Sequence, residues 1–152
     1  YAIYDCCCSG VGMYSSDKIL QEIIYLLSLN DNRMNLLKLM KELYLIDRTS
    51  IDERDTSVSG DVFYSMPHGP ILSQTLNMLN DLVNNKWGDY LDAVSAKYYP
   101  DIQIKQEMDF DRLSHKDLRT LLQKSLKTLL IPYLNGLTLK AVVKKSAIVM
   151  LC

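Results

Sequence analysis

Histidines and adjacent carboxyl groups are the residues of this sequence that could carry out acid–base or metal chemistry. The histidines are His68 and His115, and neither stands near a serine or cysteine in a recognisable nucleophile setting. Asp52 and Glu53 form an acidic pair, but hydrolysis needs two carboxylates set across a substrate, and nothing in their spacing provides this. We therefore predict no catalytic residue, and solvated loop charges explain the acidic pair better than a hydrolase active site.

The cysteines are confined to the two ends of the chain, at Cys6–Cys8 and Cys152. Zinc fingers use two spaced pairs of ligands, and these cysteines lack that spacing. We expect reduced, exposed thiols, with metal binding or lipid attachment as the alternatives. Gly60 and Gly69 stand alone, so the sequence contains no glycine-rich phosphate loop. The sequence therefore indicates no cofactor.

Length and charge favour a single domain. Hydrophobic residues are 48% of the 152 residues, which is enough for one core. The formal net charge of -1 offers no basic field for phosphate backbones or anionic lipid, which disfavours nucleic acid as a partner. No apolar run approaches the roughly 20 residues needed to cross a bilayer, and the N-terminus lacks a signal-peptide pattern. We expect a cytoplasmic protein without a membrane partner.

Two helices are predicted in the first third of the chain. Ser16 is the expected N-cap of a helix that runs to about residue 29, because apolar residues recur there at spacings of three and four. The segment N-D-N at 30–32 forms a turn, and a second helix follows over about 33–50. Because the connection is short, the two helices should pack antiparallel as a hairpin.

After the second helix the pattern changes to a loop at 51–57 and a short extended segment at 58–66. Gly69 supplies backbone freedom at a turn, and Pro70 fits the first turn of a third helix that reaches about residue 85. The buried stripe of this helix is expected to contain Leu72, Leu76, Leu79 and Val83.

The remaining elements are a ribbon and a fourth helix. Apolar residues alternate with polar ones over 102–108, which predicts a small antiparallel ribbon. Ser114 and Asp117 resemble a capping box that opens a helix from about His115. The predicted fold class is therefore mainly α, a compact helical domain with a small antiparallel β element, at the margin of α+β.

The run at 59–70, S-G-D-V-F-Y-S-M-P-H-G-P, concentrates turn formers and aromatic residues between two helices. Asp47, near the end of the second helix, is placed to accept hydrogen bonds from this turn. An ordinary ion pair of Asp47 with Arg48 is the alternative. Asp61, directly after Gly60, is expected to cap or orient the same turn.

The aromatic residues near this run have two interpretations. Phe63, Tyr64 and Trp87 are either binding anchors, because aromatics give large contact area for little entropy loss, or parts of the core. We favour the core for Phe63. His68 precedes Gly69 and Pro70, where a neutral imidazole is expected to bond to the backbone and hold the turn.

Three segments, in this order, resemble the Panacea domain, also called the SocA-like antitoxin family. They are L-L-K-L-M-K-E-L-Y-L-I-D-R at 36–48, S-G-D-V-F-Y at 59–64 and M-P-H-G-P-I at 66–71. The resemblance spans residues 16–122. It implies a bacterial or prophage-borne type II antitoxin that binds a cognate protein toxin directly; some members bring the toxin to a cellular protease. The family has no accepted catalytic residues.

The positions that match the family's motif are candidates for maintaining a binding surface. By this resemblance, the residues that shape the central turn are Asp47, Asp61, His68, Gly69 and Pro70. The other candidate partner-binding or motif residues are Arg48, Gly60, Tyr64 and Trp87.

A winged-helix-like DNA-binding regulator is the alternative function, because helices followed by a ribbon can place one helix in a major groove. The third helix has Lys86 near its end, but its polar face is otherwise neutral.

The two ends of the chain differ from the part between them. Helix-like order begins only after Met13, so we predict that 1–12 is an upstream or non-native extension. After Lys124 the sequence is apolar and basic, without an acidic residue. One restored adenine near Lys124 permits the reading Q-K-V-F-E-N-F-A-D-S-L-S-Q-W-T-H, which is similar to the polar, His-containing end of Panacea domains. We predict a shifted frame in 125–152, with a genuine loop and apolar terminal element as the alternative, and a domain at 13–124.

Overall fold

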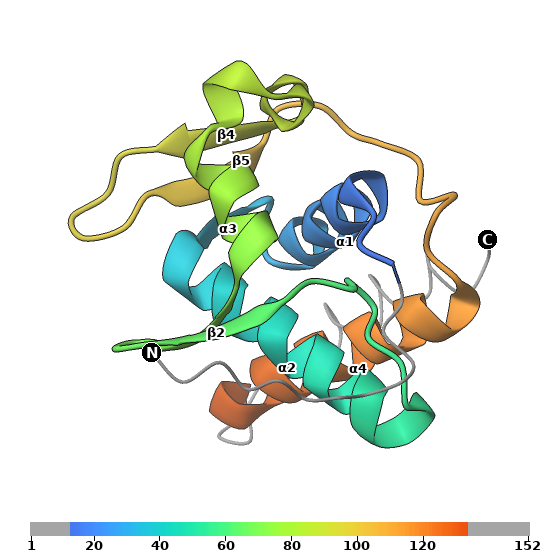
Figure 1. The fold of residues 1–152 in the computed structure, drawn as a ribbon. Coiled ribbons are helices and arrows are strands. Elements are labelled where there is room, and N and C mark those ends of the chain that lie inside the picture. Colours follow the sequence, from blue (N-terminus) through green and yellow to red (C-terminus); the bar gives the residue numbers. More distant parts are fainter. Residues whose placement is uncertain (1–12, 134–152) are drawn as a thin grey trace.

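Helix α1 (Ser16–Leu29) runs through the centre of the fold (Figure 1). The computed structural model describes residues 13–133, with side chains to Lys124. Every residue from Ile19 to Leu27 is buried, so other elements surround α1 and it buries more than one stripe. The predicted bounds of this helix are confirmed. Its N-cap, however, is Ser15, and Ser16 is the first helical residue.

A short strand, β1 (Arg33–Asn35), separates α1 from helix α2 (Leu36–Arg54). The side chain of Asn35 accepts a hydrogen bond from the amide of Leu37 at 3.1 Å and caps α2. The prediction that the second helix begins near residue 33 is wrong, because residues 33–35 pair with a distant strand. Three residues are too few to show a periodicity in the sequence.

Helix α2 ends at Arg54, one turn later than the sequence indicates. The segment 51–54, predicted as loop, is helical, and the chain leaves the helix at Asp55, whose φ of 55° is left-handed. Arg54 donates a hydrogen bond to the hydroxyl of Ser50 at 2.5 Å and forms an ion pair with Asp117 at 3.1 Å. The ion pair with the distant Asp117 therefore helps to hold the last turn of α2, although the charged residues of this turn had suggested a loop.

Helices α1 and α2 contribute to the same hydrophobic core, and their antiparallel packing as a hairpin stays a prediction. The nearest backbone neighbours of α1 are helix α4 (His115–Tyr133), strand β5 (Asp101–Ile104) and β1. Those of α2 are strand β3 (Gly69–Leu72) and α4, which lies beside α2 in Figure 1. Strand β1, which pairs with β5, therefore occupies the connection between the two helices that the sequence indicated as a turn and helix start.

Three strands form an antiparallel sheet in the order β1, β5 and β4 (Leu91–Val94). In its register Ile102 of β5 lies between Met34 and Ala93. Met34 and Ile102 are buried in the core. The antiparallel pairing predicted around residues 102–108 is confirmed, but the strand ends at Ile104, and residues 105–108 lie beyond it.

A second, two-stranded sheet joins β2 (Phe63–Met66) to β3, and we call this pair the ribbon. Pro70 lies in β3, so the prediction that it begins a helix is wrong. It stands opposite Ser65 in the register, and helix α3 (Ser73–Asn80) begins three residues after it. A proline is tolerated at a strand position where no ladder bond needs its missing N–H.

The third helix is also shorter than predicted. Two 3-10 turns, at 82–84 and 86–89, follow the end of α3 at Asn80. Of the expected buried stripe, Leu72 and Leu79 are buried and Leu76 packs against the core. Val83 is 96% exposed, because α3 ends at Asn80 and Val83 is therefore not on the buried face of this helix.

The fourth helix confirms the predicted capping box. The amide of Ser114 donates to the carboxylate of Asp117 at 3.1 Å, and the amide of Asp117 donates to the hydroxyl of Ser114 at 3.2 Å. The fold class is confirmed as mainly α with small antiparallel sheets. None of the described helices is long and apolar enough to cross a membrane. The segment 1–12, most of 125–152 and all the cysteines lie outside the described residues.

Candidate functional site

Asp47 anchors the turn that leads into the ribbon. It is fully buried on α2, and one carboxylate oxygen accepts hydrogen bonds from the amides of Val58 and Ser59, both at 2.9 Å. Its other oxygen accepts from the hydroxyl of Ser59. Burial raises the pKa of Asp47 above its usual value, although these hydrogen bonds oppose the rise. The prediction that Asp47 accepts hydrogen bonds from the turn is confirmed.

The alternative, an ion pair of Asp47 with Arg48, is wrong. Arg48 is exposed, and its guanidinium lies 3.5 Å from the carboxylate of Asp52, one helical turn further along α2. Such an exposed pair contributes little to stability. Asp47 points inward to the turn, while Arg48 remains on the surface.

Asp61 caps α3 and so joins the turn to that helix. One of its carboxylate oxygens accepts from the amide of Gln74 at 3.1 Å. The other accepts from both the amide of Thr75, at 2.8 Å, and its hydroxyl, at 2.7 Å. These donors lie in the first turn of a helix, where backbone N–H groups have no partner within the helix. The prediction that Asp61 acts as a cap is confirmed.

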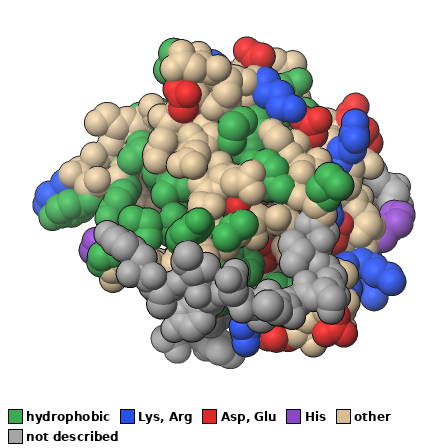
Figure 2. All heavy atoms as spheres, in the orientation of Figure 1, with side chains coloured by type: hydrophobic (Ala, Val, Ile, Leu, Met, Phe, Trp, Pro, Cys, Tyr) green, Lys and Arg blue, Asp and Glu red, His purple; other side chains and the backbone are tan. Residues whose placement is uncertain are grey.

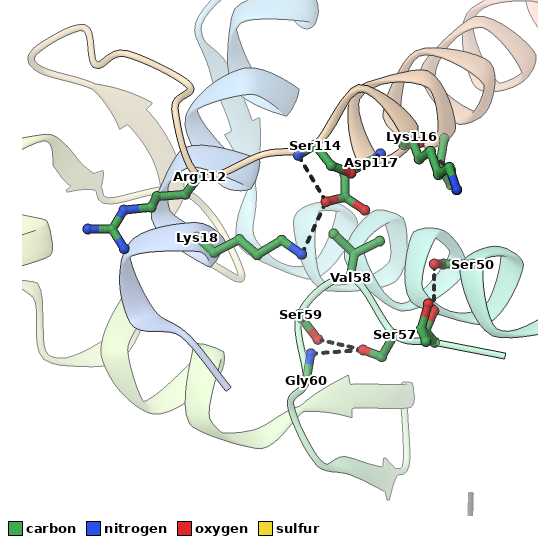
Figure 3. A network of polar contacts seen from close by, with 12 residues as sticks. Lys18, Ser50, Ser57, Val58, Ser59, Gly60, Arg112, Ser114, Lys116 and Asp117 are labelled. Carbon is green, nitrogen blue, oxygen red and sulfur yellow. Dashed lines mark hydrogen bonds and ion pairs between the residues drawn. The ribbon is translucent and has the colours of Figure 1, made fainter. Parts of the chain in front are cut away.

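Two glycines give the segment its shape. Gly60 has φ of 66°, and its amide donates to the hydroxyl of Ser57 at 2.8 Å (Figure 3). Gly69 has φ of 113° at the position where β3 leaves the ribbon's turn. Both values lie where a Cβ is disfavoured, which confirms that Gly69 supplies conformational freedom.

A second polar network lies behind this turn and joins three helices. Figure 3 shows Lys18 of α1 reaching the carboxylate of Asp117 on α4, at 3.1 Å, beside the amide of Ser114. Arg54 of α2 contacts the other carboxylate oxygen at 3.1 Å. Burial would raise the pKa of Asp117, but the hydrogen bond and charge of Lys18, with bonds from Ser114, bring that pKa below its usual value. Sequence reasoning found the cap of α4 but not its two cationic partners, which are distant in the chain.

Glu22 is the polar residue that sequence reasoning missed most clearly. Its side chain is fully buried on α1, and neither carboxylate oxygen has a hydrogen-bond partner among the residues that the structure describes. Burial raises the pKa of Glu22 well above its usual value; the carboxylates of Asp47 and Asp117 raise it further, and Lys18 opposes them. The environment of Glu22 therefore favours the neutral acid over the carboxylate. A glutamate inside an apolar helical run was the signal that could have found it.

The ribbon presents different residues on its two faces. On the inner face, Leu72 is buried and the ring of Phe63 lies edge-on to that of Tyr44, with centroids 5.4 Å apart. Phe63 is half-buried there, which agrees with the preference for the core. On the outer face, Tyr64 is 39% and Met66 44% exposed. Figure 2, in the same orientation as Figure 1, shows hydrophobic side chains gathered on the face of the molecule where β2 lies.

His68 lies at the exposed tip of the ribbon. Its ring lies edge-on to that of Tyr99, at a centroid distance of 6.2 Å, which brings the tip next to the loop between β4 and β5. The expected hydrogen bond from its imidazole to the local backbone is absent among the described contacts. In the same loop Tyr98 is 81% exposed, and the ammonium of Lys97 lies 5.1 Å from its ring centre.

Trp87 belongs to the core and is not a surface anchor. Its side chain is fully buried, and its indole N–H donates to the hydroxyl of Ser16 at 3.1 Å. Because it is buried, Trp87 cannot contact a partner directly, and its place is in the core. The sequence did not decide between core and interface, because tryptophan is common in both places.

The described polar clusters connect helices and turns of the fold. Within residues 13–133 the side chains of His, Cys, Asp and Glu form no group able to hold a metal ion. A hollow of about 400 Å³ lies between α1 and the segment after β5, away from the ribbon. Its walls are mixed: the apolar side chains are Ile24, Ile104, Met108 and Phe110, and the polar or charged ones are Ser28, Asn32, Lys105 and Glu107.

Comparison with known proteins gives one family. The family model described as antitoxin SocA-like, Panacea domain, matches residues 39–134, a range that contains the Asp47 turn, the ribbon and α3. The chain matches no curated protein and no solved structure.

Proposed function

This chain belongs to the antitoxin SocA-like Panacea family, and from that premise we propose that it is the antitoxin of a type II pair that neutralises a small protein toxin by direct contact. The observation that carries direct contact is the outer face of the ribbon. It exposes Val62, Tyr64 and Met66, while the two ends of the preceding turn are fixed by Asp47 and Asp61. Pre-formed surfaces with aromatic and methionine side chains are typical of protein interfaces.

The candidate residues divide into two groups under this proposal. Arg48, Tyr64 and His68 lie on the surface and are the proposed toxin contacts. The others set the conformation of the surface from below or within it: Asp47, Gly60, Asp61, Gly69, Pro70 and, from the core, Trp87. The toxin and this chain would meet in the cytoplasm, where some family members also deliver their toxin to a protease.

Co-expression with the protein encoded next to this gene tests the proposal. That protein should arrest growth when expressed alone, and co-expression of this chain should restore growth and give a complex that purifies as one species. If growth is restored only when the toxin is degraded, and not when it is merely bound, the adaptor role is indicated. Failure of the wild-type chain to bind or rescue would contradict the proposed function, and steeply salt-dependent binding to duplex DNA would favour the regulator.

Matched variants locate the contact surface. The double variant Tyr64→Ala and Met66→Ala should weaken the complex at least about tenfold, because buried aromatic and methionine contacts carry much of an interface's energy. Val83→Ala is the control, since Val83 is an equally apolar side chain, 96% exposed, that lies outside the ribbon. Equal loss of binding in both would show that the effect is not specific to the ribbon.

A further inference from the structure

The register of the ribbon decides which backbone groups of β2 point outward. Val62 stands one step beyond the pair of Phe63 with Leu72, and its carbonyl accepts from the amide of Ser73 at 3.0 Å. In antiparallel sheets, bonded and non-bonded pairs alternate. The pairs at Tyr64 and Met66 are therefore bonded within the ribbon, and the N–H and C=O groups of Phe63 and Ser65 point away from β3.

The opposite edge of the ribbon is protected. Strand β3 packs against α2, and its residue opposite Ser65 is Pro70, which has no N–H to offer. Strand β2 is the outer strand. Natural proteins usually protect such an edge with charged residues, prolines or bulges. The four residues of β2, F-Y-S-M, include none of these, and the described residues make no hydrogen bond to the outward groups of Phe63 and Ser65.

We propose that the outer edge of β2 is the docking site for an extended segment of the toxin, which adds to the ribbon as a third strand. This inference rests on the proposed function. The outward N–H and C=O groups of Phe63 and Ser65 would pair with the incoming backbone. The side chains of Tyr64 and Met66 would flank alternate side chains of the added strand on the outer face.

The ribbon also defines the chemistry of the segment that it would accept. Residues 62–72 contain no Asp, Glu, Lys or Arg, and the exposed side chains of the outer face are apolar. A charged strand would lose hydration there without gaining an opposite charge. The expected partner segment is therefore an uncharged strand of the toxin with apolar or aromatic residues at alternate positions.

Ser65→Pro tests the strand pairing directly, with Ser65→Ala as its matched control. Ser65 is exposed, and its N–H makes no bond within the ribbon, so proline removes an outward donor while leaving the ladder to β3 intact. With the neighbour-encoded protein as the probe, Ser65→Ala should bind within about twofold of wild type and Ser65→Pro at least about tenfold more weakly. Equal binding by the two variants would overturn the proposal.

Amide hydrogen exchange in the wild-type chain gives a second test that does not depend on a variant folding. On forming the complex, the amides of Phe63 and Ser65 should exchange at least about tenfold more slowly, while that of Tyr64, already bonded to β3, should change less. Unchanged exchange at Phe63 and Ser65 in a saturated complex would also overturn the strand pairing. If the wild-type chain binds and rescues but these results fail, the antitoxin function stands and only the docking mode is wrong.

Discussion

The carboxylate of Asp61 lies 2.8 Å from the amide and 2.7 Å from the hydroxyl of Thr75, fourteen residues later in the chain. Through this contact the cap of α3 comes from the turn before the ribbon, and not from Leu72, the residue at the helix's own N-cap position. The base of the ribbon is thus closed by the side chain of Asp61 together with the backbone hydrogen bond from Ser73 to Val62. Asp47 fixes the other side of the same turn, so the outer face of β2 is held by two buried carboxylates.

Removing the cap should destabilise the protein. Asp61→Ala leaves the donors of Gln74 and Thr75 without their acceptor, and we expect a loss of about 2 kcal/mol in the free energy of unfolding. Urea denaturation followed by circular dichroism measures this loss. The control is Asp92→Ala, because Asp92 is exposed and, among the described residues, its carboxylate accepts only from the amide of Ala93. Equal stability of the two variants would show that Asp61 is not a significant cap.

The stability difference between Glu22→Gln and wild type should depend on pH. The pKa of Glu22 is raised in the folded state by burial and by Asp47 and Asp117. Below about pH 4 both states carry the neutral acid, so the group has no effect. Above this pH the unfolded chain ionises first, and folding loses about 1.4 kcal/mol per pH unit until the folded pKa is reached.

Glutamine cannot ionise in either state, so the variant should gain stability relative to wild type as the pH rises from 5 to 8. Denaturation midpoints across this range measure the gain, with Glu53→Gln, at an exposed position, as the control. A constant difference between Glu22→Gln and wild type at all pH values would mean that Glu22 titrates normally.

Two neighbouring leucines of α2 separate core packing from helix propensity. Leu43 is fully buried and Leu45 is 43% exposed. Leu43→Ala should cost roughly 2 to 5 kcal/mol, because it removes buried methyl groups and leaves a cavity. Leu45→Ala should cost less than about 1 kcal/mol, since a large part of this side chain already lies in solvent and its loss leaves no buried cavity. Similar costs measured by urea denaturation would contradict the placement of the core.

Gly69→Val should strain the backbone without a steric clash. Apart from the two adjacent residues, no atom of the described residues lies within 4 Å of the position of an added Cβ, so we assign the cost to the φ of 113°. We expect a loss of about 1 to 3 kcal/mol, because a β-branched residue disfavours this conformation strongly. An unchanged midpoint in urea would show that the turn relaxes to another conformation at no cost.

Much of the fold was predictable where the signal is local. The bounds of α1, the capping box of Ser114 and Asp117, and the hydrogen-bonding roles of Asp47 and Asp61 follow from periodicity and from short polar side chains beside turns. The error at Pro70 has a physical cause. A proline followed by spaced leucines suits both a helix start and a strand that precedes a helix, and only the pairing of β3 with β2 distinguishes the two.

The sequence by itself determined the family, the predominance of helix and the residues that shape the central turn, because these depend on short segments whose residue types have strong local preferences. The tertiary structure alone decided that Trp87 and Glu22 are buried, that Lys18 and Arg54 meet at Asp117, and that one edge of the ribbon faces outward. These features depend on contacts between residues far apart in the chain, and local preference carries no information about which distant groups will meet.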